Sequence, residues 1–418
     1  MAKTVPLDAG TLAWARDRFA EYYAGARIDP PTRLARREFA AFPFAEATMM
    51  RRHATLRTPE EFAGFLRHEV PRHVYYSTAY YQRPAAPNME AKEWMGADLI
   101  FDLDSDHLRG AESRDYAGQL ALVKARLLQL FDDFLAFDFD IERSSASIVF
   151  SGGRGYHVHI RDDRFLQLTS PDRRELVDYI MGTGVHEWVA SAAIVRRRES
   201  VETGRSLGGV DAEDGHGAGR RPPGPPIPHL CPRDAPGWPG RVSRSTRDLF
   251  AKWGAEGYDA ALPEMREYGL TPSQARKVVD GGMWHRVVED GALEVFPKLL
   301  PVEFFARIVR SAAIPVQGET DAPVTTDIHR LIRLPNSLHG GTGLRVVPLA
   351  REAVDAFDPF ADALTDLPGR VPVEFRAEVD HPFPGGLRGH PGGTDELPTP
   401  QAVFLVLRGE AALRPSPG

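Results

Sequence analysis

The sequence has little that would place this chain outside a cell or in a membrane. Its 418 residues include a single cysteine, Cys231, which excludes an internal disulfide and any multi-cysteine zinc or iron–sulfur site within the chain. No apolar run approaches the ~20 residues that span a bilayer, and residues 1–6 contain no apolar signal segment. These absences predict a cytoplasmic protein that does not contact a membrane.

The sequence also lacks a strong excess of charge. The net charge is −7, and nearly all of the 51 basic residues are arginine. This balance argues against a general nucleic-acid coat, which is usually basic, but it is compatible with a local basic channel. The hydrophobic fraction of 42% is that of a globular protein, and the length predicts two or three domains.

Two paired carboxylates end an apolar run. Residues 97–101 lead directly into Asp102 and Asp104, and side chains two positions apart share one face of a strand. Two carboxylates this close repel one another unless a cation lies between them, and oxygen ligands suit Mg²⁺ or Mn²⁺. The pattern fits a two-metal phosphoryl-transfer site, although a solvated strand end is the alternative. Asp138 and Asp140 repeat the spacing but lead into polar residues, which predicts a loop with its acids in water.

A glycine-rich turn follows, at residues 151–155, between two predicted strands at 146–150 and 156–160. Glycines let a backbone approach a phosphate closely, and unshielded N–H groups form an anion nest. An arginine fork matches phosphate oxygens. The candidate phosphate ligands are Ser151, Gly152, Arg154 and His157. His159 shares the face of His157 and is interpreted as structural; a tight hairpin with a surface arginine is the alternative for the whole turn.

The third segment covers residues 321–344. It opens with Asp321, a candidate third metal ligand, and closes on a loop rich in Ser, His, Gly and Thr. Arg333 and His339 are placed to meet triphosphate charge. Asp327 is a rival acid, but it fits better as the N-cap of a predicted helix over 328–332.

Together the three segments resemble the catalytic small subunit of archaeal and eukaryotic-type DNA primase, and the archaeal form most closely. They read Asp-x-Asp after an apolar strand, then Ser-Gly-x-Arg-Gly-x-His, then Asp…Arg-Leu-Ile-Arg-x-Pro-x-Ser-Leu-His-Gly-x-Thr-Gly. The resemblance runs over roughly residues 35–160 and 300–348, and three motifs in order are specific where one is weak.

The resemblance assigns roles by position. It implies that the metal carboxylates are Asp102, Asp104 and Asp321, and that the nucleotide-binding residues are Ser151, Gly152, Arg154, His157, Arg333, His339 and Arg52. Arg51 is the alternative to Arg52 if the local alignment slips by one residue. Gly153 stands where many relatives carry a second basic residue, so that contact is missing or supplied elsewhere. Many relatives also carry a zinc knuckle, which a chain with only Cys231 does not build, so no zinc is predicted.

The fold implied is α/β, a mixed-sheet core with an inserted, largely helical segment. Residues 1–180 form the first part of the core, and 181–300 form the insertion, with a Gly/Pro-rich flexible loop at 199–243. Residues 301–348 complete the core, and 349–418 are a Pro-rich C-terminal tail. The apolar run near 403–407 and the helical segment are candidate docking surfaces.

The function implied is primer synthesis on single-stranded DNA from nucleoside triphosphates, with Mg²⁺ or Mn²⁺ in a two-metal site. The partner implied is a large primase subunit that carries an iron–sulfur cluster. Two other classes compete with this interpretation. A metal-dependent nuclease also uses clustered aspartates but does not need a triphosphate cradle, and an inactive scaffold would not need three intact carboxylates.

Overall fold

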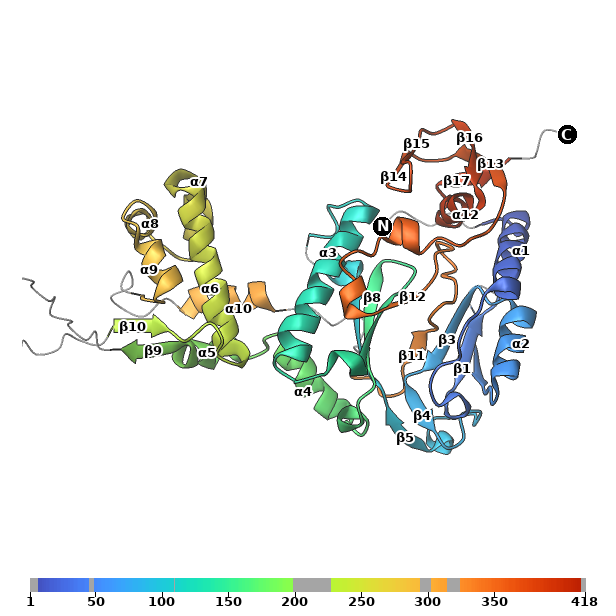
Figure 1. Cartoon of the computed structure of the whole chain (residues 1–418), viewed down its shortest axis with the longest axis horizontal. Coiled ribbons are helices and arrows are strands. Elements are labelled where there is room, and N and C mark those ends of the chain that lie inside the picture. Colours follow the sequence, from blue (N-terminus) through green and yellow to red (C-terminus); the bar gives the residue numbers. More distant parts are fainter. Residues whose placement is uncertain are drawn as a thin grey trace, which may run out of the picture. The chain divides into compact units, whose positions relative to one another are not determined.

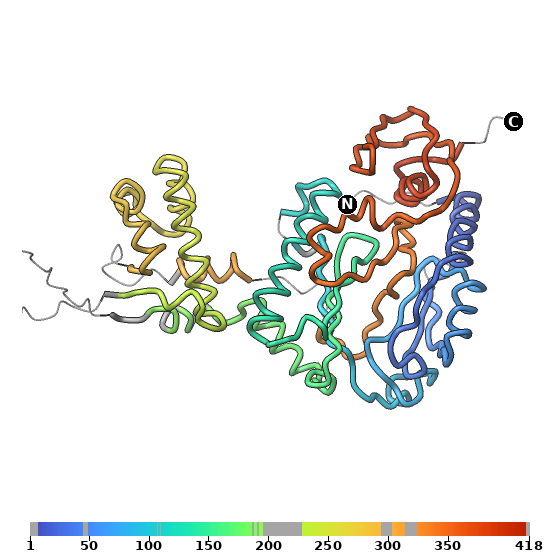
Figure 2. The backbone as a smooth tube through the Cα atoms, in the orientation of Figure 1, coloured from blue at the N-terminus to red at the C-terminus, as the bar shows by residue number. Residues whose placement is uncertain are grey.

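The computed structural model describes residues 7–44, 49–108, 110–197, 227–293, 302–313 and 324–414. The chain divides into two compact units, residues 1–177 with 315–418, and residues 178–314. Figure 2 shows the chain leave the first unit, form the second, and return to complete the first. The predicted motifs therefore belong to one unit, although they lie far apart in the sequence.

The first sheet of this unit packs against two helices (Figure 1). The helices are α1 (Ala9–Gly25), whose first turn is capped by Asp8, and α2 (Pro59–Glu69), which is capped by Thr58. The strand order is β11-β3-β1-β2, with β1 (Phe39–Phe42), β2 (Arg51–Ala54), β3 (His73–Ser77) and β11 (Leu331–Arg333). Apolar side chains from both layers form one core, including Phe19, Phe39, Phe62, Val74 and Ile332.

The second sheet carries the paired carboxylates. Its strand order is β12-β7-β8-β6, with β6 (Leu99–Asp104), β7 (Ala146–Phe150), β8 (Gly155–Ile160) and β12 (Val347–Leu349). Helix α3 (Tyr116–Gln129) contacts β6 and β8 and continues as a π-helical segment, Leu130–Ala136. A two-stranded ribbon, β4 (Ala79–Tyr81) with β5 (Trp94–Ala97), precedes β6.

The α/β class expected from the sequence is confirmed, with one difference in detail. Every pairing between strands that the structure describes is antiparallel, so the sheets are not mixed. For β7 and β8 the reason is local, because a tight turn joins these two strands and a tight turn joins antiparallel strands.

The C-terminal residues are folded rather than extended as a tail. They form α11 (Pro359–Asp362), β13 (Arg370–Phe375), β14 (Val379–His381), β15 (Leu387–Gly389), β16 (Thr394–Pro398), α12 (Thr399–Arg408) and β17 (Ala411–Leu413). The apolar run of α12 is buried, and Val403 and Leu407 join the core of the first sheet. The run was predicted to be an exposed docking surface because it is apolar, and that prediction is wrong, since the run is buried.

The second unit is mainly helical. It contains α5 (Val185–Ala193), β9 (Ile194–Arg197), β10 (Ile227–Leu230), α6 (Gly237–Glu256), α7 (Tyr258–Glu267), α8 (Pro272–Val279), α9 (Met283–Glu289) and α10 (Val302–Ala312), while α4 (Ser170–Ile180) crosses the boundary between the units. Large buried side chains such as Trp238, Phe250 and Phe304 form its core.

The flexible loop predicted over 199–243 is wrong for residues 227–230 and 237–243, which form regular secondary structure. Residues 198–226 lie outside the described residues, but 227–230 form β10 and 237–243 begin α6. Glycine and proline mask the helical pattern there, although Trp238 and Val242 are buried four positions apart. Among the described residues no helix is long and apolar enough to cross a membrane.

Candidate active site

The paired carboxylates project from the end of β6. In the antiparallel register with β8, Asp102 lies opposite His157 and Asp104 lies opposite Gly155. The side chains of Asp102 and Asp104 are 28% and 30% exposed, while Phe101, before them, and Leu103, between them, are buried. The strand alternation thus places both carboxylates on the open face, as their spacing predicted.

The carboxylates lie in an environment that disfavours two negative charges. Burial raises the pKa of Asp104, and the charges of Asp102 and Asp106 add to that effect. The Asp106 N–H, 3.1 Å from Asp104 Oδ1, and Arg154, whose Nε is 3.8 Å from the same oxygen, oppose it only in part. A cation bound between Asp102 and Asp104 would relieve this repulsion.

The glycine-rich turn is fixed by hydrogen bonds on both sides. Ser151 Oγ accepts the N–H groups of Gly153 and Gly155, each at 3.3 Å. The Thr342 hydroxyl donates to the Gly152 carbonyl at 2.5 Å, and the Tyr116 hydroxyl donates to the Gly153 carbonyl at 2.6 Å. The turn is therefore held between the third motif and α3.

Glycine is required at two positions of this turn. Gly152 has φ +73°, and a Cβ there would lie 2.8 Å from the Cβ of His339. A Cβ on Gly155 would lie 2.3 Å from the carbonyl oxygen of Leu103 on β6. Glycines thus allow the turn to approach both the carboxylate strand and the histidine loop.

The third motif enters the site through β11 and the loop after it. Arg333 Nη1 donates to His73 Nδ1 at 2.6 Å, and the rings of His73 and His339 meet edge to face at 5.1 Å. Burial, together with Arg333 and Arg72, lowers the pKa of His73 to about 2. Burial likewise holds the pKa of His339 well below its ordinary value. Both imidazoles are neutral near pH 7, and the guanidinium of Arg333 carries the positive charge.

These residues meet in one cleft of about 940 Å³. Of the predicted site residues it brings together Asp102, Asp104, Ser151, Arg154, His157, Arg333 and His339. His157 is buried, with Nε2 3.5 Å from Asp102 Oδ1, and burial lowers its pKa. His159 is fully buried beside the Tyr76 hydroxyl, at 3.3 Å, which agrees with a structural role.

Other predicted residues lie elsewhere. Arg52, on β2, pairs with the fully buried Glu38 at 3.0 Å and does not line the cleft. Asp321 lies outside the described residues. The helix predicted over 328–332 is wrong, because residues 331–333 form β11; the Asp327 carboxylate instead accepts the His329 N–H at 2.8 Å within a turn.

The cleft also contains residues that the sequence did not single out. Arg72 precedes β3, Tyr116 begins α3, and Arg408 ends α12. The spacing of these residues in the sequence does not predict a shared site, because each reaches the cleft only through tertiary packing of segments far apart in the sequence. Arg408 comes from the region expected to be a tail.

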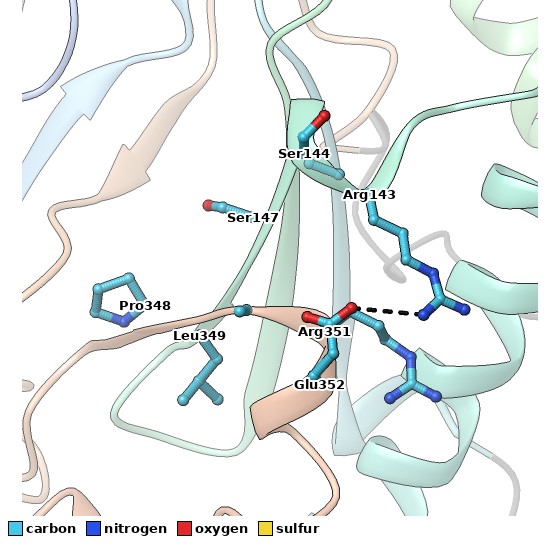
Figure 3. A pocket seen from close by; sticks show the side chains of 9 residues that line it. Arg143, Ser144, Ser147, Pro348, Leu349, Arg351 and Glu352 are labelled. Atoms are coloured by element: carbon cyan, nitrogen blue, oxygen red, sulfur yellow. Dashed lines mark hydrogen bonds and ion pairs between the residues drawn. The ribbon is translucent and has the colours of Figure 1, made fainter.

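A second cavity, of about 520 Å³, lies beside β7 and β12 (Figure 3). Its arginines already face carboxylates: Arg143 lies 3.5 Å from Glu352, and Arg351 lies 2.6 Å from Asp132. Both arginines of this cavity are thus held in ion pairs. The cleft, which gathers Arg72, Arg154, Arg333 and Arg408 beside the paired carboxylates, is the better candidate for binding an anionic substrate together with a cation.

The residues of the cleft fit a divalent cation in part. Across the described ranges, no group of three or more His, Cys, Asp or Glu side chains converges to hold a metal. Asp102 and Asp104 nevertheless supply carboxylate oxygens, which hard cations such as Mg²⁺ and Mn²⁺ prefer, and burial with mutual repulsion makes their pairing costly without one. The predicted third ligand, Asp321, falls in a segment that the structure leaves undescribed.

Carboxylates on a strand end, a glycine-rich turn beside them and flanking arginines define a class of protein, the metal-dependent nucleotidyltransferases. Comparison with known families agrees with this class. The model of the DNA primase small subunit family matches residues 101–351, more than half of the chain.

Curated relatives extend the match over almost the whole length. The chain is 38% identical to the DNA primase small subunit of Methanocella arvoryzae over 97% of this chain and 99% of that one. It is 37% identical to the small subunit of Methanothrix thermoacetophila and 35% identical to that of Natronomonas pharaonis, again over 97% and 99% of the two chains. The chain belongs to the DNA primase small subunit family, the primer-synthesising nucleotidyltransferases of DNA replication. The family and the activity predicted from the three motifs are thereby confirmed.

Proposed function

We propose that this chain joins nucleoside triphosphates on a single-stranded DNA template through the chemistry of the described cleft. The observation that carries the proposal is the meeting of Asp102 and Asp104 with Arg154, Arg333 and His339 in one cavity. A nuclease requires the carboxylates but not a set of cations placed for a triphosphate. A scaffold requires neither.

The reaction is attack of a 3′-hydroxyl on the α-phosphorus of the next nucleotide; a new P–O bond forms, and the bond to pyrophosphate breaks. Divalent ions held by Asp102 and Asp104 would lower the pKa of the attacking hydroxyl and stabilise the charge on phosphorus. Arg154 and Arg333 would hold the β- and γ-phosphates in line through charge-assisted hydrogen bonds. Neutral His339 would donate an N–H to a phosphate oxygen, with its ring held by His73.

The turn would supply a rigid wall of the phosphate site. Its N–H groups at Gly153 and Gly155 already donate to Ser151 Oγ, and the hydroxyls of Thr342 and Tyr116 hold the carbonyls of Gly152 and Gly153. Because the turn is fixed before substrate binds, little ordering entropy is lost when the phosphates arrive. The template base, rather than the protein, would select the nucleotide.

We further propose Asp321 as the third metal ligand, Mg²⁺ or Mn²⁺ as the ion, and no zinc knuckle, since the chain has only Cys231. Arg52 is proposed as a nucleotide contact from the resemblance alone, and its pairing with Glu38 limits its freedom. As a replication enzyme the protein would act in the cytoplasm.

The name that the relatives share implies a large partner subunit, together with DNA and nucleotide substrates. We propose that this partner carries an iron–sulfur cluster and strengthens template binding, because a net charge of −7 gives the isolated chain little general attraction for DNA. Template binding by the chain alone is expected to be weak and to fall steeply with added salt.

Primer synthesis on single-stranded DNA tests this proposal. The purified chain, alone and with its large subunit, is given labelled ribonucleotides or deoxyribonucleotides with and without Mg²⁺ or Mn²⁺. Metal-dependent incorporation supports the proposal. Release of an end label from DNA without incorporation would identify a nuclease, and no reaction in the presence of the partner would leave only a scaffold.

A further inference from the structure

The end of α12 places an arginine in the cleft. Leu405 and its apolar neighbours are buried, and the helix ends at Arg408, where Gly409 has φ +76° and lets the chain reverse into β17. This reversal directs Arg408 toward α3 and the glycine-rich turn. Its side chain is 24% exposed and lines the same cleft as Arg154 and His339.

Arg408 is held on one edge and along its face. Its Nε donates to Glu410 Oε1 at 2.7 Å, and the other oxygen of Glu410 lies 2.6 Å from His381 Nε2. The guanidinium lies over the ring of Tyr116 at 4.3 Å and over that of Phe404 at 5.0 Å. Burial would raise the pKa of Glu410, but His381 and Arg408 outweigh it and lower that pKa, so the anchor is a carboxylate.

The other edge of the guanidinium is unpaired. Among the residues that the structure describes, neither Nη of Arg408 has a hydrogen-bond acceptor. The structural arginines of the same unit differ: both Nη atoms of Arg37 and of Arg173 donate to backbone or carboxylate oxygens. An arginine fixed by Nε, with two free donors in a cleft, is arranged to bind an oxyanion.

The position of Arg408 indicates which oxyanion. Tyr116, on which the guanidinium rests, donates its hydroxyl to the Gly153 carbonyl of the turn at 2.6 Å. Gly153 carries no cation, and a Cβ there would lie only 2.9 Å from His339 Nε2. Arg408 therefore places a positive charge beside the part of the turn that has no basic side chain of its own.

We propose that Arg408 binds the terminal phosphates of the incoming nucleoside triphosphate, and that Glu410 positions it. This inference rests on the proposed function, since it takes the cleft to be the triphosphate site. It makes the C-terminal residues beyond the third motif part of the substrate site rather than an appendage.

The test compares nucleotides that differ only in phosphate number. ATP, ADP and AMP are titrated with Mg²⁺ against the full chain, Arg408→Met and Glu410→Gln. Arg408→Met keeps the apolar contact with Tyr116 and Phe404 but removes the donors. It should weaken ATP binding about tenfold or more, the scale of one charge-assisted contact, and leave AMP binding nearly unchanged; Glu410→Gln should produce a smaller loss of the same selectivity.

Two controls separate this role from packing and from general charge. Arg388→Met removes an 85% exposed arginine on β15, in the same C-terminal region, and should leave all three affinities unchanged. If Arg408→Met does not fold by circular dichroism, Arg408→Lys keeps the charge without the fork and should still reduce the preference for ATP over AMP.

The outcomes distinguish the inference from the proposed function. Weaker ATP binding by Arg154→Ala but not by the folded Arg408 variants overturns the role of Arg408 alone. Loss of single-stranded DNA binding by Arg408→Met with unchanged ATP affinity also overturns it and makes Arg408 a template contact. A wild-type chain that binds none of the nucleotides overturns the proposed function, and the inference with it.

Discussion

The buried ion pair of Arg37 and Asp98 offers the sharpest test of how the carboxylate strand is supported. Asp98 precedes β6, and its Oδ2 lies 2.8 Å from Arg37 Nη2. Arg37 is fully buried and also donates to the carbonyls of Thr32 and Ser77. Replacement of Arg37 by Met would leave the Asp98 carboxylate buried. Among the described residues, the side-chain donor that it would keep is the Tyr80 hydroxyl, at 2.5 Å.

Breaking one side of a buried pair typically costs about 3–5 kcal/mol, because the remaining charge is uncompensated. We expect Arg37→Met to lower the free energy of unfolding by that amount in urea denaturation. The double variant Arg37→Met with Asp98→Asn should recover part of the loss, because the stranded charge is gone. Arg388→Met, which breaks an exposed pair with Asp380 at 3.5 Å, should cost less than about 1 kcal/mol. A loss below about 1 kcal/mol for Arg37→Met would refute this reasoning.

Two further predictions concern the phosphate side of the cleft. Arg154→Ala or His339→Ala should weaken triphosphate binding at least tenfold, with smaller effects on template binding, since each removes a contact worth about 1.5–3 kcal/mol. Unchanged affinity in a nucleotide titration would show that these residues do not bind the triphosphate. Burial lowers the pKa of His73 to about 2 in the folded chain. As the pH falls below ~6.5, His73 therefore gains a proton in the unfolded chain but not in the folded chain. Stability from His73 is therefore present above that pH and lost on acidification, and His73→Gln should flatten the loss by at most about 1.4 kcal/mol per pH unit, measured by denaturation at pH 7 and pH 5.

The parts of the site that the sequence predicted are those fixed by local structure. Strand alternation alone placed Asp102 and Asp104 on one face, and a five-residue glycine turn between two apolar runs made the hairpin of β7 and β8. Of the control pair, Asp140 is exposed in a loop after the π-helical segment, as expected, whereas Asp138 is half-buried; neither lines the cleft.

The parts that the sequence did not predict depend on long-range packing. Residues 331–333 have a helical pattern in isolation, but they pair with β3, more than 250 residues earlier in the chain, and tertiary pairing overrides local propensity. The C-terminal prolines suggested a tail because the apolar run in α12 is short; that run is buried against a core made by the N-terminal helices. Arg408 and Arg72 reach the cleft through long-range packing of this kind, so no spacing rule could have found them.

The most direct test of the account is metal-dependent primer synthesis by two matched variants in complex with the large subunit. Asp104→Asn removes a carboxylate from the cleft, and Asp140→Asn removes one from the control loop, where φ is +50° and asparagine is tolerated. The account predicts that Asp104→Asn folds but incorporates no nucleotide, while Asp140→Asn primes like the wild type. Wild-type-like synthesis by Asp104→Asn would contradict the assignment of this cleft as the site of nucleotidyl transfer.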